Sequence, residues 1–169
     1  MTNTWITADS HFGHSKIIEY CNRPFSDINE MNSELIKRWN SKISDDDVVY
    51  VLGDFSFRDG YQCFHQLKGN KHLIVGNHDG DKILSLPWLS RDIRLEIKLP
   101  DKTGKKHTII MDHYPMESWN HSHRESLHFH GHVHGRVLNP IKNRVDVGVD
   151  CWNFYPVSLD EILEKVSKV

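Results

Sequence analysis

Short apolar runs in the first half of the chain each end at a cluster of polar residues. The runs Thr4–Ala8, Val48–Leu52 and Leu73–Val75 are rich in β-branched residues and have the length of buried strands. An apolar stripe with spacings near three and four predicts a helix over residues 27–43, and residues 59–67 can form a second, crossover helix. Strands that alternate with helices indicate βαβ units and a parallel sheet.

The second half of the chain changes to the period-2 pattern of exposed strands. Ile93–Leu99 alternates strictly, Asp101–Gly104 is turn-like, and Thr108–Met111 is apolar again, which together predict a hairpin. Two more strands and a closing helix are expected in the order Leu127–His130, Val145–Val149 and Leu159–Val166. The whole chain, residues 1–169, has the length of one ordinary α/β domain.

Two of the expected helices carry a capping-box pattern at their start. Asp27 precedes Glu30 by three residues, and Ser158 precedes Glu161 in the same way. Both pairs predict where the helices begin.

The polar clusters that follow the strands contain carboxylate, amide and imidazole side chains and no thiolate. This donor set suits borderline divalent ions such as Mn, Fe, Co, Ni or Zn. Seven candidates are too many for one tetrahedral ion, and they suit two ions that share a carboxylate. Since ligands gather at the carboxyl ends of strands in α/β sheets, we expect the clusters to meet at one edge. The candidates are Asp9, His11, Asp54, Asn77, His113, His132 and His134.

Composition narrows the partners and the location. A formal charge of −2 argues against the broad basic surface that dominates non-specific duplex binding. No apolar stretch has the length of a membrane span, and Trp5–Thr7 is needed as the first strand, so we expect neither a membrane partner nor a signal peptide. Cys21, Cys63 and Cys151 lack the spacing of a disulfide or zinc framework, which favours reduced thiols and a cytoplasmic protein. The sequence does not indicate an oligomeric state.

The five motifs, in this order, resemble those of the calcineurin-like metallophosphoesterase superfamily. They are Asp9-Ser10-His11, Gly53-Asp54, Gly76-Asn77-His78-Asp79, Asp112-His113 and Gly131-His132-Val133-His134. The resemblance covers nearly the whole chain, and His11-Phe12-Gly13-His14 is most similar to small, capless bacterial and phage-type phosphoesterases. It implies two mixed β-sheets packed face to face and flanked by helices, a four-layer α/β/β/α fold.

The resemblance also implies a role for each motif residue. A first metal ion would be held by Asp9, His11 and His134, a second by Asn77, His113 and His132, and Asp54 would bridge them. A hydroxide between two divalent ions, manganese first among the candidates, would attack phosphorus without a covalent intermediate. His78 would protonate the leaving oxygen or donate to a transition-state oxygen.

Substrate contacts are expected from His14, Arg58, Asn77 and His78, with Arg23 as a weaker candidate. Arg58 follows Asp54 by four residues, where the protein-phosphatase branch of the superfamily has an arginine that grips phosphate. That branch has an aspartate at the preceding position to orient its histidine, and this chain has Phe57 there.

The remaining histidines are expected on exposed strand faces or in loops: His107, His121, His123, His128 and His130. One of them could hydrogen-bond a ligand residue.

The preferred function is hydrolysis of small, nucleotide-like phosphodiesters, because a chain of this length leaves no room for a cap domain over the site. Alternatives within the enzymes are a phosphomonoesterase acting on nucleotides or phosphoproteins, and a nuclease. Alternatives without turnover are a catalytically silent scaffold that binds proteins, and a structural metal protein. A scaffold would be expected to lose ligands, whereas every ligand position here holds a competent residue.

Overall fold

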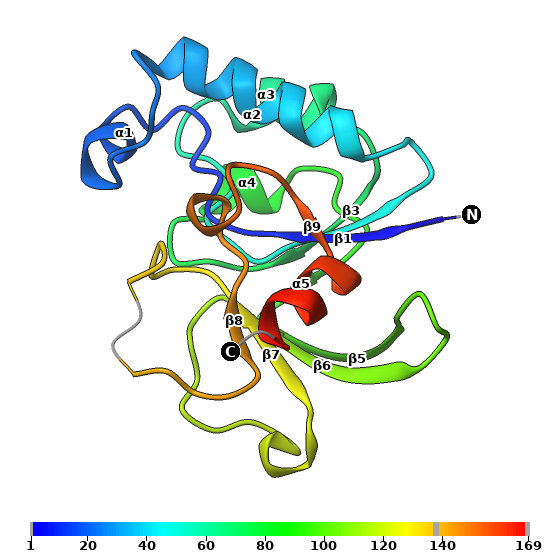
Figure 1. Ribbon diagram of the computed structural model, residues 1–169. Helices are drawn as coiled ribbons and strands as arrows, with labels where there is room; N and C mark the ends of the chain where they lie inside the picture. Colours follow the sequence, from blue (N-terminus) through cyan, green and yellow to red (C-terminus); the bar gives the residue numbers. More distant parts are fainter. Residues whose placement is uncertain (1, 137–138, 168–169) are drawn as a thin grey trace.

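Two β-sheets form the centre of the computed structural model, which describes residues 2–136 and 139–167 (Figure 1). The first sheet has the order β4-β3-β2-β1-β9, in which β1 to β4 are parallel and β9 is antiparallel to β1. Its strands are β1 Thr4–Thr7, β2 Val48–Val51, β3 Asn70–Ile74, β4 Arg91–Asp92 and β9 Val157–Ser158. The predicted parallel βαβ arrangement of the first half is therefore confirmed.

The second sheet has the order β5-β6-β7-β8 and is also mixed. The predicted hairpin is present as the antiparallel pair β5 and β6, and β6, β7 and β8 run parallel. Its strands are β5 Arg94–Pro100, β6 Lys106–Asp112, β7 Leu127–His130 and β8 Arg144–Asp146.

The expected strand Val145–Val149 is wrong in its second part. The chain leaves the second sheet after Asp146 and reaches the first sheet, where Gly148 bridges Ala8 and the Val149 N–H donates to the Ala8 carbonyl. A 3-10 helix, η2 Val149–Cys151, follows. The alternating apolar residues therefore do not form one strand: Val145 pairs in the second sheet, and Val149 lies beside the first sheet.

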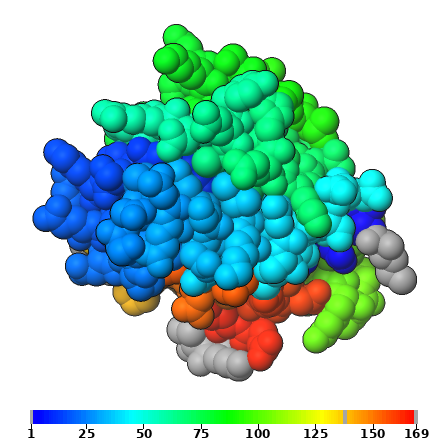
Figure 2. Space-filling model, turned by 90° about the horizontal axis from the view of Figure 1, so that it is seen from above, coloured from blue at the N-terminus to red at the C-terminus, as the bar shows by residue number. Residues whose placement is uncertain are grey.

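Helices cover the outer face of the first sheet (Figures 1 and 2). They are α1 Lys16–Tyr20, α2 Ile28–Lys42, α3 Gly60–Gln66 and α4 Asp81–Leu84. One core lies between this layer and the sheet, and includes Met31, Leu35, Trp39, Val49, Val51 and Leu73. Within the described ranges, no helix is long and apolar enough to cross a membrane.

The two predicted capping boxes have different outcomes. Ser158 and Glu161 form a complete capping box at the start of α5 Leu159–Val166. Asp27 does cap α2 by accepting from two backbone N–H groups, but the Glu30 carboxylate bonds the backbone and hydroxyl of Ser26. The reciprocal half of that box is therefore shifted by one residue.

A second core lies between the sheets and beneath α5. It includes Ile6, Leu52, Ile74, Ile109, Met111, Phe129, Leu159 and Ile162. Since these side chains use the inner faces of both sheets, the strand ends are fixed relative to one another.

The outer face of the second sheet is covered by the segment 113–126, which contains a short 3-10 helix, η1 Ser122–Arg124. His128 and His130 are therefore buried, and the expectation that they lie on an exposed face is wrong. The Met116 N–H donates to His128 Nε2, and the Trp119 ring lies 5.2 Å from the His128 ring. Burial lowers the pKa of His128 to about 4, so this imidazole is a neutral part of the packing.

Candidate metal centre

The five polar motifs come together where β1, β2, β3, β6 and β7 end, at neighbouring edges of the two sheets. Five of the seven candidate ligands have a backbone φ in the left-handed region, which residues other than glycine rarely adopt: Asp9, His11, Asp54, His132 and His134. Such strained conformations persist only where the surrounding structure fixes them, and they gather at functional sites.

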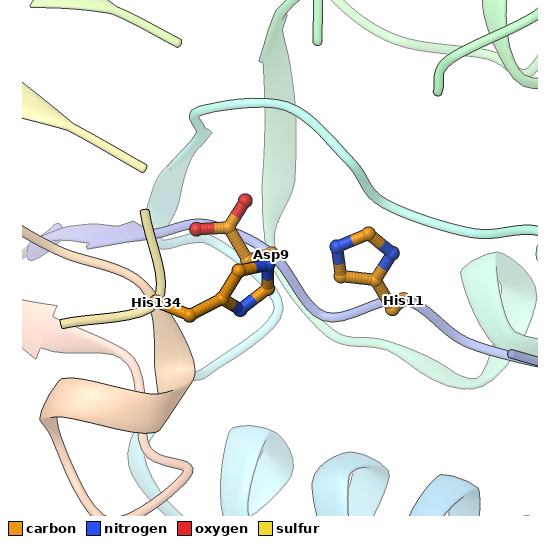
Figure 3. Close-up of side chains that lie close together, drawn as sticks. All are labelled: Asp9, His11 and His134. Atoms are coloured by element: carbon orange, nitrogen blue, oxygen red, sulfur yellow. The ribbon is translucent and has the colours of Figure 1, made fainter. Parts of the chain in front are cut away.

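A first cluster consists of Asp9, His11 and His134 (Figure 3). One ligand atom from each lies within 4.8 Å of the others, and the rings of His11 and His134 are stacked with centroids 5.2 Å apart. His134 Nδ1 is 2.8 Å from a carboxylate oxygen of Asp150, which leaves Nε2 to face the cluster.

A second cluster consists of Asp54, His113 and His132, again with ligand atoms within 4.8 Å. The Asn77 Oδ1 atom lies 3.0 Å from His113 Nε2 and 3.1 Å from His132 Nδ1, so the amide belongs to the same group. His113 Nδ1 lies 2.8 Å from the Leu52 carbonyl and donates to it, which directs Nε2 towards the cluster.

The Asp54 carboxylate lies between the two clusters. Its Oδ2 atom is 3.5 Å from His11 Nε2 and also 3.5 Å from His113 Nε2, while Oδ1 accepts the backbone N–H of His78. Burial alone would raise the pKa of Asp54, but the hydrogen bond and charge of His113 outweigh this effect and lower the pKa to about 2. A charged carboxylate therefore faces a histidine from each cluster.

The donor set fits divalent cations. His11 is buried with neither ring nitrogen hydrogen-bonded, and burial lowers its pKa to about 3, so it is a neutral imidazole with a free lone pair. Burial raises the pKa of Asp9 to about 7, because a buried carboxylate is costly without a nearby cation. A cation held by these residues would accept the free lone pair of His11 and would neutralise the buried carboxylate of Asp9.

Two aspartates without an assigned role hold the ligand loops. The Asp79 carboxylate accepts from the backbone N–H groups of Asp54, Phe55 and Gly76, and so joins two loops. Asp146 accepts from the N–H groups of Gly135 and Gly148 and holds the end of the histidine loop. The role of Asp79 could have been predicted, because it lies in the motif Gly76-Asn77-His78-Asp79. Asp146 lies in no motif, and its only distinguishing feature is its position at the end of β8.

Arg23 is not a substrate-side residue, and that expectation is wrong. Its side chain is buried and makes two hydrogen bonds of 2.9 Å to the carboxylate of Asp150. Its other bonds go to the carbonyls of Asp9 and Ser10 and to the sulfur of Met31. Arg23 thus fixes both the first ligand loop and the carboxylate that orients His134.

The remaining substrate candidates lie on the open side of the centre. His78 is exposed, and its ring centroid is 5.8 Å from those of both His11 and Phe57. His14 is half-buried, with its ring 5.5 Å from His11 and 4.5 Å from Phe57. Arg58 is exposed on the following loop. In the described part of the chain no carboxylate bonds the His78 ring, and an aromatic ring borders it instead.

Comparisons with known proteins place the chain among small proteins of similar length. No established protein-family model matches it. The uncharacterized protein MJ1445 of Methanocaldococcus jannaschii is 34% identical over 175 residues, which cover 99% of this chain and 93% of that protein. The Gene 66 protein of Mycobacterium phage L5 is 29% identical, with 100% of this chain and 96% of the phage protein covered.

One solved structure has a closely similar fold. AQ665 from Aquifex aeolicus, a protein of unknown function, is 22% identical and has a TM-score of 0.74 over 98% of this chain and all of that chain. An archaeal phosphodiesterase is a weaker match, with 15% identity and a TM-score of 0.45 over 87% of this chain and 82% of that chain. The match with AQ665 supports an α/β fold with two mixed sheets, and the candidate ligand loops lie at the carboxyl ends of their strands.

Proposed function

We propose that this chain is a two-metal phosphoesterase with the calcineurin-like metallophosphoesterase fold and that it hydrolyses small phosphodiesters. The chain belongs to the same protein family as MJ1445 of Methanocaldococcus jannaschii. The observation that carries the proposal is the position of Asp54, whose Oδ2 atom is 3.5 Å from a histidine of each cluster. One carboxylate between two oxygen and nitrogen donor sets is the arrangement that a pair of ions needs.

In this proposal each cluster holds one ion. Asp9, His11 and His134 hold the first, Asn77, His113 and His132 the second, and Asp54 is shared. The ions supply positive charge for the phosphate oxygens and activate water near neutral pH. Manganese is the ion we expect first, with Fe, Ni, Co or Zn as alternatives, since this donor set does not select among them.

The chain's own residues bind the ester and handle the proton. The His78 backbone is held by its bond to Asp54, so its ring stays beside the clusters on the open side. From there it donates a proton to the leaving oxygen, a role typically worth about 10² to 10⁴ in rate. His14 and Arg58 bind the non-bridging oxygens, and the guanidinium does so through its bidentate fork.

The preference for diesters rests on the open side of the centre. Asn77, His78 and Arg58 are exposed, and no described segment covers them, so an ester with a substituent on each side can enter.

The test is hydrolysis of p-nitrophenyl phosphate and bis(p-nitrophenyl) phosphate by the purified protein, with Mn²⁺, Ni²⁺ or Zn²⁺ added after chelation. We expect metal-dependent turnover with the diester preferred. Preference for the monoester would change the assignment to a phosphatase. No turnover with any of the metals would favour the silent scaffold over the enzyme.

A further inference from the structure

A pocket of about 700 Å³ opens beside His78. One wall is the segment from Ser56 to Tyr61, which follows β2 and enters the first turn of α3, and the other is the segment from Gly80 to Pro87, which contains α4. His78 lines this pocket and also borders the first cluster, so the pocket and the metal centre share one residue. The volume is in the range of small-molecule sites, roughly 300 to 1,000 Å³.

Two aromatic rings on the first wall are exposed to solvent. Phe57 is 51% exposed and Tyr61 is 68% exposed, although both are large apolar side chains. The Phe57 ring lines the pocket and lies 4.5 Å from the His14 ring and 5.8 Å from the His78 ring, both of which border the first cluster. Exposed aromatic faces beside a phosphoester site suit the stacking of a nucleobase, which every base permits through its π-face.

Two cations line the same pocket. In the described part of the chain neither the Arg58 guanidinium nor the Lys82 ammonium makes a hydrogen bond or an ion pair, and one carboxylate, Asp81, lies among the lining residues. Uncommitted cations that outnumber the carboxylates attract an anionic ligand. An aromatic wall and a positive charge next to a phosphoester centre together match a nucleotide.

We infer that this pocket binds the nucleoside part of the substrate, with the base stacked on Phe57 and Tyr61 and its anionic groups near Arg58 and Lys82. The inference rests on the proposed phosphoesterase function and names the substrate class as nucleoside phosphodiesters. Phe57 therefore has a role in place of the aspartate that the resemblance leads one to expect there. It forms a binding surface and not a hydrogen-bond partner for His78.

The test compares two esters that react at the same phosphate with the same leaving group. They are thymidine 5′-(p-nitrophenyl phosphate) and methyl p-nitrophenyl phosphate, assayed with the metal-loaded protein. We expect wild-type protein to have the lower KM for the thymidine ester. Phe57→Ala and Tyr61→Ala should each raise that KM roughly 5-fold or more, the loss that one stacked base represents, and change the KM of the methyl ester much less.

A matched control is Tyr20→Ala. Tyr20 is 55% exposed and its ring lies 6.3 Å from the His14 ring, but it does not line the pocket. Its removal should leave the ratio of the two KM values unchanged. Equal ratios in wild type, Phe57→Ala and Tyr61→Ala would overturn the assignment of the pocket.

Failure of the proposed function would look different, since neither ester would then be hydrolysed by any variant. In that case equilibrium dialysis with thymidine 5′-monophosphate decides about the pocket. Binding that is lost in Phe57→Ala supports it, and no binding overturns it. Binding of a thymidine decamer that is much tighter than that of the mononucleotide and falls steeply with salt would overturn the small substrate in favour of a nucleic-acid strand.

Discussion

The two halves of the candidate metal centre are built differently. In the first half, Asp9 and His11 are buried and the loop is held by the ion pair of Arg23 and Asp150. In the second half, Asn77 is exposed, and His113 is oriented by a neutral hydrogen bond to a backbone carbonyl. Charged hydrogen bonds inside the protein hold a geometry more firmly than neutral hydrogen bonds of an exposed side chain. We therefore expect the first half to bind its ion more tightly and the second to be the half that adapts to substrate.

The largest expected effect comes from the residue that both halves share. Asp54→Asn keeps the size of the side chain but removes the charge that lies 3.5 Å from a histidine of each half. Loss of several kcal/mol of charge stabilisation corresponds to a fall in kcat/KM of about 10²-fold or more. The measurement is steady-state hydrolysis of bis(p-nitrophenyl) phosphate at saturating Mn²⁺.

His14→Ala is the comparison for this variant, because His14 borders the first half without belonging to either cluster. Its loss of activity should be much smaller. Equal losses in the two variants would mean that Asp54 is not the shared ligand.

The candidate ligand positions were predictable because each follows an apolar strand and because the order of the motifs resembles that of a known superfamily. The ion pair of Arg23 and Asp150 that holds the first half was not predictable in this way. Arg23 and Asp150 are 127 residues apart, and neither lies in one of the five motifs. Their pairing is a consequence of the packing of η2 beside the first ligand loop, which no local pattern contains.

The fold shows the same division between local and tertiary information. The positions of the longer helices and strands follow from periodicity, whereas the short elements α1, α4, β4 and β9 were not predicted. The parallel first sheet follows from the alternation of elements. The burial of His128 and His130 does not, because the face they occupy is covered by an irregular segment with no apolar period of its own. The alternation of histidines with apolar residues in β7 is consistent with an exposed outer face. Only the segment 113–126, which covers this face, makes the histidines buried.

A smaller effect, on metal affinity, is expected when only the carboxylate that supports the first half is changed. Asp150→Asn removes the charge that orients His134 and pairs with Arg23. Loss of such a supporting partner typically lowers metal affinity about 10- to 100-fold. Calorimetric titration with Mn²⁺ should show one weakened site and one site close to its wild-type affinity.

Asp160→Asn is a matched control with the same chemical change. Asp160 accepts one exposed hydrogen bond from the Lys102 N–H, outside both clusters. Both affinities should be unchanged in that variant. Equal weakening of both sites by Asp150→Asn would contradict the separate construction of the two halves.

Metal removal should also lower the melting temperature. An ion at 100 times its Kd stabilises the native state by about 2.7 kcal/mol, or roughly 5 to 10 °C for a chain of this size. The gain should depend on pH, since burial raises the pKa of Asp9 to about 7 in the metal-free protein. Because the folded pKa lies above that of the unfolded chain, a proton on Asp9 stabilises the fold at low pH, and this contribution is lost as pH rises towards 7 and above.

The cation and the proton thus compete for the same carboxylate, and the rise in melting temperature on adding Mn²⁺ should be larger at pH 8 than at pH 6. Differential scanning calorimetry with and without chelator at both pH values measures it. In Asp150→Asn, where the first half binds its ion weakly, the gain should shrink at both pH values. A gain that Asp150→Asn leaves unchanged would mean that the second half, and not the buried first half, supplies the stabilisation by metal.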